Sequence, residues 1–153
     1  MNRKSMIKTV ALVLLGLGTL GSAYADDGGC SNRLIAGDYG FTIQGTKLGG
    51  PGFLGPQLGV AMTHFNVDGS FTQIDTITIS GMVVADFTHT PANGTYTLNR
   101  DCTGTYTINF TDGRPPVTVN FIVVKHGAEI DGVVTSVNGN QGIISVSAVG
   151  KRR

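Results

Sequence analysis

The sequence predicts an all-β protein whose single domain is an eight-stranded antiparallel up-and-down barrel, with a β-sandwich as the second possibility. Two observations predict this class. Apolar residues recur with a period of two almost everywhere after Gly37, which is the period of a strand and not of a helix. Turn-forming pairs such as Asn93-Gly94 and Asp112-Gly113 interrupt the pattern at short intervals, as in a series of hairpins.

The alternation is clearest in three segments. Tyr39, Phe41 and Ile43 alternate with Asp38, Gly40 and Thr42, and segments 95–99 and 103–110 repeat the pattern with threonine on the second face. One apolar and one threonine-rich face are typical of an antiparallel sheet with one side in water.

Placing strands between the turn signals gives eight strands and no convincing helix. The predicted strands are 38–48, 59–67, 70–80, 94–100, 102–111, 117–126, 128–137 and 141–150. An even number of strands joined mostly by tight turns removes its edges most simply by closing into a barrel. A sandwich usually needs several long crossings between its sheets, and this chain offers only two long connections, near 49–58 and 81–93.

Residues 1–25 have the order of a cleavable export signal. Three basic residues precede an uncharged apolar stretch at 9–22, and the pattern Ala23-Tyr24-Ala25 follows. We expect cleavage after Ala25, which leaves one domain, 26–153, in the periplasm or outside the cell. That domain keeps eight basic against ten acidic residues, a formal charge of −2, and nothing in this balance indicates nucleic acid as a partner.

Cys30 and Cys102 are the two cysteines of the chain, and an even count in an exported protein predicts a disulfide between them. In the loop-closure model, a bridge over this separation stabilises the fold by about 4 kcal/mol. The two cysteines and three scattered histidines match no metal-ligand spacing, so we expect no metal and no cofactor.

Several function classes lack their sequence signatures. The string G-x-G-x-x-G occurs at 50–55, but no helix that could meet a pyrophosphate follows it, so it predicts a flexible loop. The G-x-S-x-G elbow of many hydrolases is absent, and most acidic residues lie at predicted turns. The lack of tryptophan and of aromatic girdles argues against a transmembrane barrel. We therefore expect a protein that is not membrane-integral, either a monomer or a small homo-oligomer.

Four stretches together resemble a group of small exported bacterial proteins, the calycin-like, allene-oxide-cyclase-like barrels. These stretches are 36–41, 59–69, the link from 94–98 to 101–104, and 121–124. They consist mainly of turn and packing residues, so the resemblance implies the barrel fold. It places none of that cyclase family's catalytic residues on this chain.

Candidate ligand-binding residues come from two patterns. Tyr39, Tyr96 and Tyr106 fall on faces predicted to point inward, where each ring fills space and each hydroxyl needs a partner. Phe53 and Leu54 lie among glycines and prolines in an irregular loop that could cap a barrel mouth. For all five residues, ordinary packing is the competing interpretation.

The third predicted strand carries the least expected residues. Phe71, Ile77 and Ile79 define its apolar face, and the alternation places Gln73 and Asp75 on the same face. A buried carboxylate needs hydrogen bonds or a charged partner. Asp75 must therefore reach water in an open lumen, meet a tyrosine hydroxyl or a histidine, or be turned outward by a bulge. Together Gln73 and Asp75 could form the polar floor of an otherwise apolar pocket.

These observations favour a barrel that binds one small, largely apolar molecule in its lumen. The alternatives are a cyclase or isomerase on the same fold, which rests on the resemblance alone, and a non-catalytic structural or surface-interaction protein with a filled core. The volume of the lumen distinguishes the structural protein, whose core is filled, from the binding protein and the enzyme, which both need space for a small molecule. A barrel plugged by Phe41, Phe71, Tyr106 and Phe121 would leave no room for a ligand.

Overall fold

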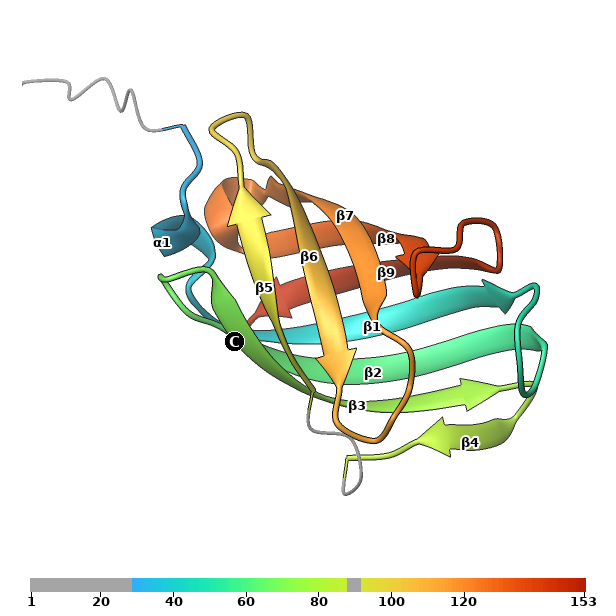
Figure 1. Ribbon diagram of the computed structural model, residues 1–153. Helices are drawn as coiled ribbons and strands as arrows, with labels where there is room; N and C mark the ends of the chain where they lie inside the picture. The colour runs from blue at the N-terminus through green and yellow to red at the C-terminus, as the bar shows by residue number, and fades with distance from the viewer. Residues whose placement is uncertain (1–28, 88–91) are drawn as a thin grey trace, which may run out of the picture.

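The computed structural model describes residues 29–87 and 92–153, and its ribbon is drawn in Figure 1. The predicted signal peptide, residues 1–25, lies outside the described residues. The described residues form nine strands and two short helices: α1 (Asn32–Ile35), β1 (Gly37–Lys47), β2 (Gly55–Phe65), β3 (Ser70–Ile79), β4 (Met82–Ala85), β5 (Ala92–Leu98), β6 (Thr103–Phe110), β7 (Val117–Val124), the 3-10 helix η1 (Lys125–Gly127), β8 (Glu129–Val137) and β9 (Ile144–Arg152).

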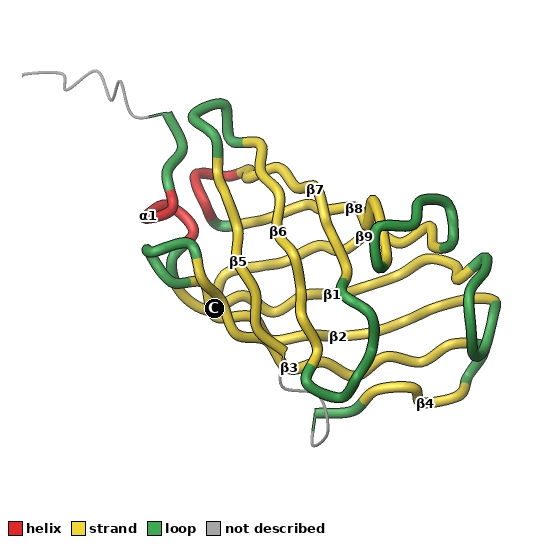
Figure 2. The backbone as a smooth tube through the Cα atoms, in the orientation of Figure 1, coloured by secondary structure: helices red, strands yellow, loops and turns green. Residues whose placement is uncertain are grey.

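Eight of these strands close into an antiparallel barrel, in the order β1-β2-β3-β5-β6-β7-β8-β9 and back to β1. Each barrel strand pairs with the one that precedes it, and Figure 2 shows that short connections join most of them. The up-and-down barrel predicted from the sequence is confirmed, and all eight predicted strands are present. Of the described residues, none belongs to a helix long and apolar enough to cross a membrane.

β4 is a strand that the sequence pattern missed, because it lies in the segment predicted as a long connection, 81–93. It pairs with β3 at residues 77–79, outside the barrel. β5 pairs with β3 only at residues 70–73. Over residues 74–76, β3 therefore pairs with β2 but, among the described residues, with no strand on its other side.

One end of the barrel, which we call the closed end, is covered by α1 and η1 (Figure 1). Ile35 of α1 is fully buried beneath this cover. The guanidinium of Arg152 donates hydrogen bonds to the hydroxyl of Tyr39 at 2.9 Å and to the carbonyls of Gly127 and Leu34. One arginine thereby ties β9, β1 and both helices together. The sequence analysis predicted no convincing helix and missed both of these. Each spans only about one turn, which is too short to show a helical period in the sequence.

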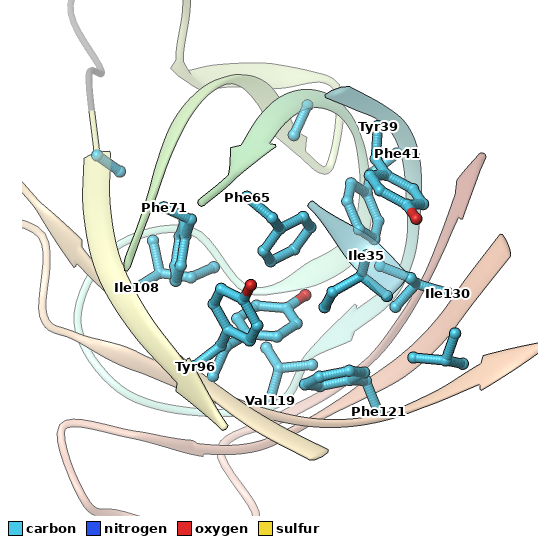
Figure 3. Packing of buried hydrophobic residues seen from close by; sticks show 14 residues of the cluster. Ile35, Tyr39, Phe41, Phe65, Phe71, Tyr96, Ile108, Val119, Phe121 and Ile130 are labelled. Atoms are coloured by element: carbon cyan, nitrogen blue, oxygen red, sulfur yellow. The ribbon is translucent and has the colours of Figure 1, made fainter. Parts of the chain in front are cut away.

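The closed half of the barrel is filled by an aromatic cluster, shown close up in Figure 3. Phe65 is its hub. The Phe65 ring lies 5.1 Å from that of Tyr96, 5.6 Å from that of Phe71 and 5.7 Å from that of Tyr39, measured between centroids. The tilted and edge-on geometries are those that aromatic quadrupoles prefer. All three tyrosines in the described residues are buried, as the alternation predicted.

Three buried rings of this cluster lie directly opposite a glycine on the neighbouring strand: Phe41 opposite Gly150, Phe71 opposite Gly94, and Phe121 opposite Gly104. In each pair the ring occupies the space that any side chain at the glycine position would need. A Cβ atom built on Gly104 would lie 2.3 Å from Cζ of Phe121, well inside van der Waals contact. The glycines thus make room for rings in a lumen only eight strands wide.

Cys30 and Cys102 lie at disulfide distance, with Cα atoms 4.9 Å apart, as predicted. Cys102 is in the turn between β5 and β6, and the backbone N–H of Cys30 donates to the carbonyl of Arg100 at 2.9 Å in the same turn. The bridge attaches the segment before α1 to the closed end of the barrel.

Gly104→Ala should destabilise the protein by about 2 kcal/mol or more, the usual cost of overpacking a rigid core. The new methyl group would clash with Phe121 and with the backbone carbonyl oxygen of Thr97, 2.5 Å away. Gly40→Ala is the matched control, because no atom lies within 4 Å of its Cβ position. Urea unfolding followed by circular dichroism measures both, and equal stabilities of the two variants would contradict the ring-over-glycine packing.

Candidate ligand-binding site

The open half of the barrel, away from α1, holds a cavity of about 890 Å³. Its floor is the underside of the aromatic cluster, where Phe41 and Tyr106 lie, and its walls are mostly aliphatic. The aliphatic wall residues include Ile43, Ala61, Ile77, Ile79, Val119, Val134, Val146 and Ala148. The loops 48–54, 111–116 and 138–143 surround its mouth. Such a volume falls in the ordinary range for small-molecule sites.

Four of the seven residues proposed from the sequence as ligand-binding line this cavity: Phe53, Gln73, Asp75 and Tyr106. Tyr39 and Tyr96 are buried in the closed half, where their hydroxyls donate to backbone carbonyls of Gly127 and Asn66. Leu54 is half exposed at the mouth and is not among the lining residues. Inward alternation identified all three tyrosines but could not tell which half of the lumen each would occupy.

A chain of hydrogen-bonded polar groups, which we call the polar wall, consists of Thr63, Gln73, Asp75 and Arg114, and the last three line the cavity. Thr63 Oγ1 donates to Gln73 Oε1 at 3.0 Å, and Gln73 Nε2 donates to Asp75 Oδ2 at 3.3 Å. Arg114 Nη2 donates to Asp75 Oδ1 at 3.2 Å. Asp75 is 2% exposed, so its charge is held by these groups and not by bulk water.

Arg114 is the functional candidate that the sequence analysis missed. It lies in the β6–β7 loop, where its Nε donates to Asp112 Oδ2 at 2.8 Å and its guanidinium stacks 3.7 Å from the centroid of the Phe110 ring. These contacts hold a planar cation at the edge of the cavity. The turn at Thr111-Asp112-Gly113 was visible in the sequence, but nothing local showed that the next side chain reaches β3.

Asp75 lies in the part of β3, residues 74–76, that has a strand on one side only among the described residues. The Arg114–Asp75 ion pair joins the β6–β7 loop to β3 across this interval. A tyrosine hydroxyl or a histidine was one of the three possibilities that the sequence left open for Asp75, and the partner is instead the guanidinium of Arg114. The bulge considered from the sequence does not occur at Asp75, since the β2–β3 register is unbroken there.

His64 lies on the outer face of β2, opposite Thr72. The connection between β2 and β3 spans residues 66–69. Nδ1 of His64 lies 2.7 Å from Asp38 Oδ1, and both side chains are more than half exposed. The pair is therefore a surface contact and lies outside the cavity.

The described residues contain no cluster of three or more histidine, cysteine, aspartate or glutamate side chains able to hold a metal ion. No protein-family model, no curated protein and no solved structure matches this chain. The barrel is compatible with a calycin-like fold, while the specific family stays a prediction. The chemistry of the site therefore has to be argued from its own residues.

Burial raises the pKa of all three described tyrosines, Tyr39, Tyr96 and Tyr106. The pKa of Tyr96 rises to about 12. In the unfolded chain a tyrosine has a pKa of about 10. The contribution of these tyrosines to the free energy of unfolding should therefore be constant up to about pH 10 and decline above it, because the unfolded chain then releases protons that the folded chain retains. Absorbance at alkaline pH and urea unfolding measure this, and Tyr106→Phe should make the decline shallower. If the free energy of unfolding of Tyr106→Phe declined above pH 10 as steeply as that of the wild type, the prediction for Tyr106 would be wrong.

Proposed function

We propose that this protein is an exported barrel that binds one small, largely apolar molecule in the open half of its lumen. The observation that carries the proposal is the cavity of about 890 Å³, walled mainly by aliphatic side chains and closed below by aromatic rings. Concave, mostly apolar sites with a few converging polar groups are the usual form of small-molecule pockets.

The polar wall suggests the chemistry of the ligand. Gln73 and Asp75 are buried on one side of the cavity, and Arg114 lies beside them at its edge. Burying a carboxylate and an amide in a mostly apolar lumen costs free energy that aliphatic side chains would not cost. We infer that these groups orient the polar end of a ligand whose hydrocarbon part lies against the remaining walls.

Export is supported by two features. The cysteines lie at disulfide distance, and disulfides persist mainly outside the cytoplasm. The N-terminal residues 1–25 have the charge and hydropathy order of an export signal. A periplasmic or secreted location is therefore part of the proposal.

The two other function classes keep weaker support. A structural role with a filled core needs the lumen to be plugged, but Phe41, Phe71, Tyr106 and Phe121 lie at or below the cavity floor and leave the open half free. A cyclase or isomerase activity rests on the resemblance to the cyclase barrels. Among the described residues that line the cavity, none is a serine, threonine, cysteine or histidine, the usual members of a nucleophile–base pair.

Filling the cavity should abolish binding. Ala61 faces the cavity from β2 and its neighbour Val60 faces outward, so Ala61→Trp and Val60→Trp form a matched pair. We expect Ala61→Trp to weaken binding of an apolar fluorescent probe such as N-phenyl-1-naphthylamine by about tenfold or more, and Val60→Trp to leave it unchanged. Native mass spectrometry of protein from its own host should show a co-purifying molecule on the wild type and on Val60→Trp, but not on Ala61→Trp. Equal probe affinity in both variants would refute the site.

The polar wall can be tested separately with Asp75→Asn and Asp75→Leu. Leucine has a similar volume but leaves the donors of Gln73 and Arg114 without their acceptor, so we expect Asp75→Leu to be less stable than the wild type by about 1–3 kcal/mol and to lose the co-purified ligand. Asparagine keeps hydrogen-bonding capacity and should retain part of the binding. Urea unfolding and native mass spectrometry are the measurements. Full retention of ligand by both variants would exclude Asp75 from the binding role.

A further inference from the structure

Charged residues are distributed unevenly between the two ends of the barrel. The closed end carries many of them on α1, on η1, in the turns and at the strand ends: Arg33, Asp38, Asp68, Arg100, Asp101, Lys125, Glu129, Lys151, Arg152 and Arg153. By contrast, Lys47 is the single charged residue of segment 43–62, and segment 76–85 has none. These two segments include the open-end halves of β1, β2 and β3, the loop between β1 and β2, and β4.

The uncharged segments expose large apolar side chains around the open end. We call six of them the apolar mouth surface: Leu48, Phe53, Leu54, Leu58, Met82 and Val83, each at least half exposed. Figure 1 places the β1–β2 loop and the β3–β4 turn side by side, at the end of the barrel opposite α1. Singly exposed apolar residues are ordinary, but a group of this size on one end of a molecule marks an interaction surface.

Hydrogen bonds and strand pairing join these residues into one surface. Ser80, in the β3–β4 turn, donates from its hydroxyl to the carbonyl of Leu54 at 2.6 Å and from its backbone N–H to that of Pro56 at 2.8 Å. Leu58 and Val83 both lie beside Thr78, one on β2 and the other on β4. The turn, the loop and the two flanking strands therefore present their apolar side chains together.

The apolar mouth surface is continuous with the cavity. Phe53 is 51% exposed and also lines the cavity, and Lys47 lines it beside the same loop. A molecule that moved from this surface into the lumen would remain in contact with apolar side chains. A second copy of the chain seated on the surface would instead cover the mouth.

We propose that the apolar mouth surface docks on a lipid surface, so that the cavity takes its ligand directly from the lipid phase. The delivery part of this inference rests on the proposed function. Two properties favour lipid over a protein partner. In segments 43–62 and 76–85, which carry the six residues, the single charged residue is the cation Lys47, which suits a bilayer with anionic headgroups, and the surface borders the entrance of an apolar cavity. The docking is peripheral, with Leu54, Met82 and Val83 entering the headgroup region.

Co-flotation with vesicles tests the docking. One set of vesicles is made of phosphatidylcholine alone and another of phosphatidylcholine mixed with phosphatidylglycerol. The exported chain is used after its N-terminus has been read by intact mass, because the apolar stretch 9–22 would itself bind lipid. We expect the wild type to float with both kinds of vesicle, and more strongly with the mixed ones because of Lys47.

The informative variant is Leu54→Glu/Val83→Glu, since neither residue lines the cavity. It should partition to vesicles about tenfold less than the wild type or weaker still, because two apolar contacts are replaced by acids. The matched control is Ile122→Glu/Val133→Glu, which changes two exposed apolar residues on the outer face of β7 and β8 and should float like the wild type.

The outcomes separate the docking from the proposed function. Failure of the wild type to float, or equal flotation of the two double variants, overturns the docking. A dimer in analytical ultracentrifugation that Leu54→Glu/Val83→Glu dissociates, without vesicle binding, also overturns it and assigns the surface to a second copy. Probe binding is measured without vesicles. Protein that floats but binds no probe refutes the proposed function and the delivery step, whereas protein that binds probe but does not float refutes the docking alone.

Discussion

The structure depends on the packing of large rings against glycines of the neighbouring strand. An eight-stranded lumen is just wide enough for side chains to fill it, so a ring on every strand would not fit. Phe71 and Phe121 are accommodated because Gly94 and Gly104 stand directly opposite them and leave the wall without side chains there. With Phe65 at the centre of the cluster, this arrangement packs buried rings into the closed half and fixes the register of the strands there.

The cavity follows from where this packing stops. Beyond Phe41 and Tyr106 the inward side chains are mostly isoleucine, valine and alanine, which do not meet across the barrel. The same half contains the interval of β3 at residues 74–76 that lacks a strand on one side among the described residues. In this interval the side chains of Arg114 and Asp75 join the β6–β7 loop to β3, whereas elsewhere in the barrel backbone hydrogen bonds join neighbouring strands. The polar wall is thus both part of the barrel's closure and the most specific chemistry that its lumen offers.

Strand identity could be predicted from the sequence because a period of two and hairpin turns are local signals. The same alternation placed Gln73 and Asp75 in the lumen, and the count of two cysteines gave their pairing. β4 was missed since four residues cannot establish a period, and Arg114 was missed because its contact with Asp75 joins residues 39 positions apart. Whether the lumen was open or filled depended on how rings and glycines combine across strands, which no single segment shows.

The two halves of the barrel are coupled through strand register. β1 and β2 pair without a shift from Gly37 opposite Phe65, at the closed end, to Lys47 opposite Gly55, at the mouth. A slip of one residue would turn every inward side chain outward, so the aromatic cluster that fixes the register at the closed end also decides which residues face the cavity. Empty volume and buried polar groups both cost stability. A barrel can keep them in its open half when the aromatic packing, the Arg152 hydrogen bonds and the cysteine bridge hold the other half. The candidate site accordingly lies at the end away from these three sets of contacts.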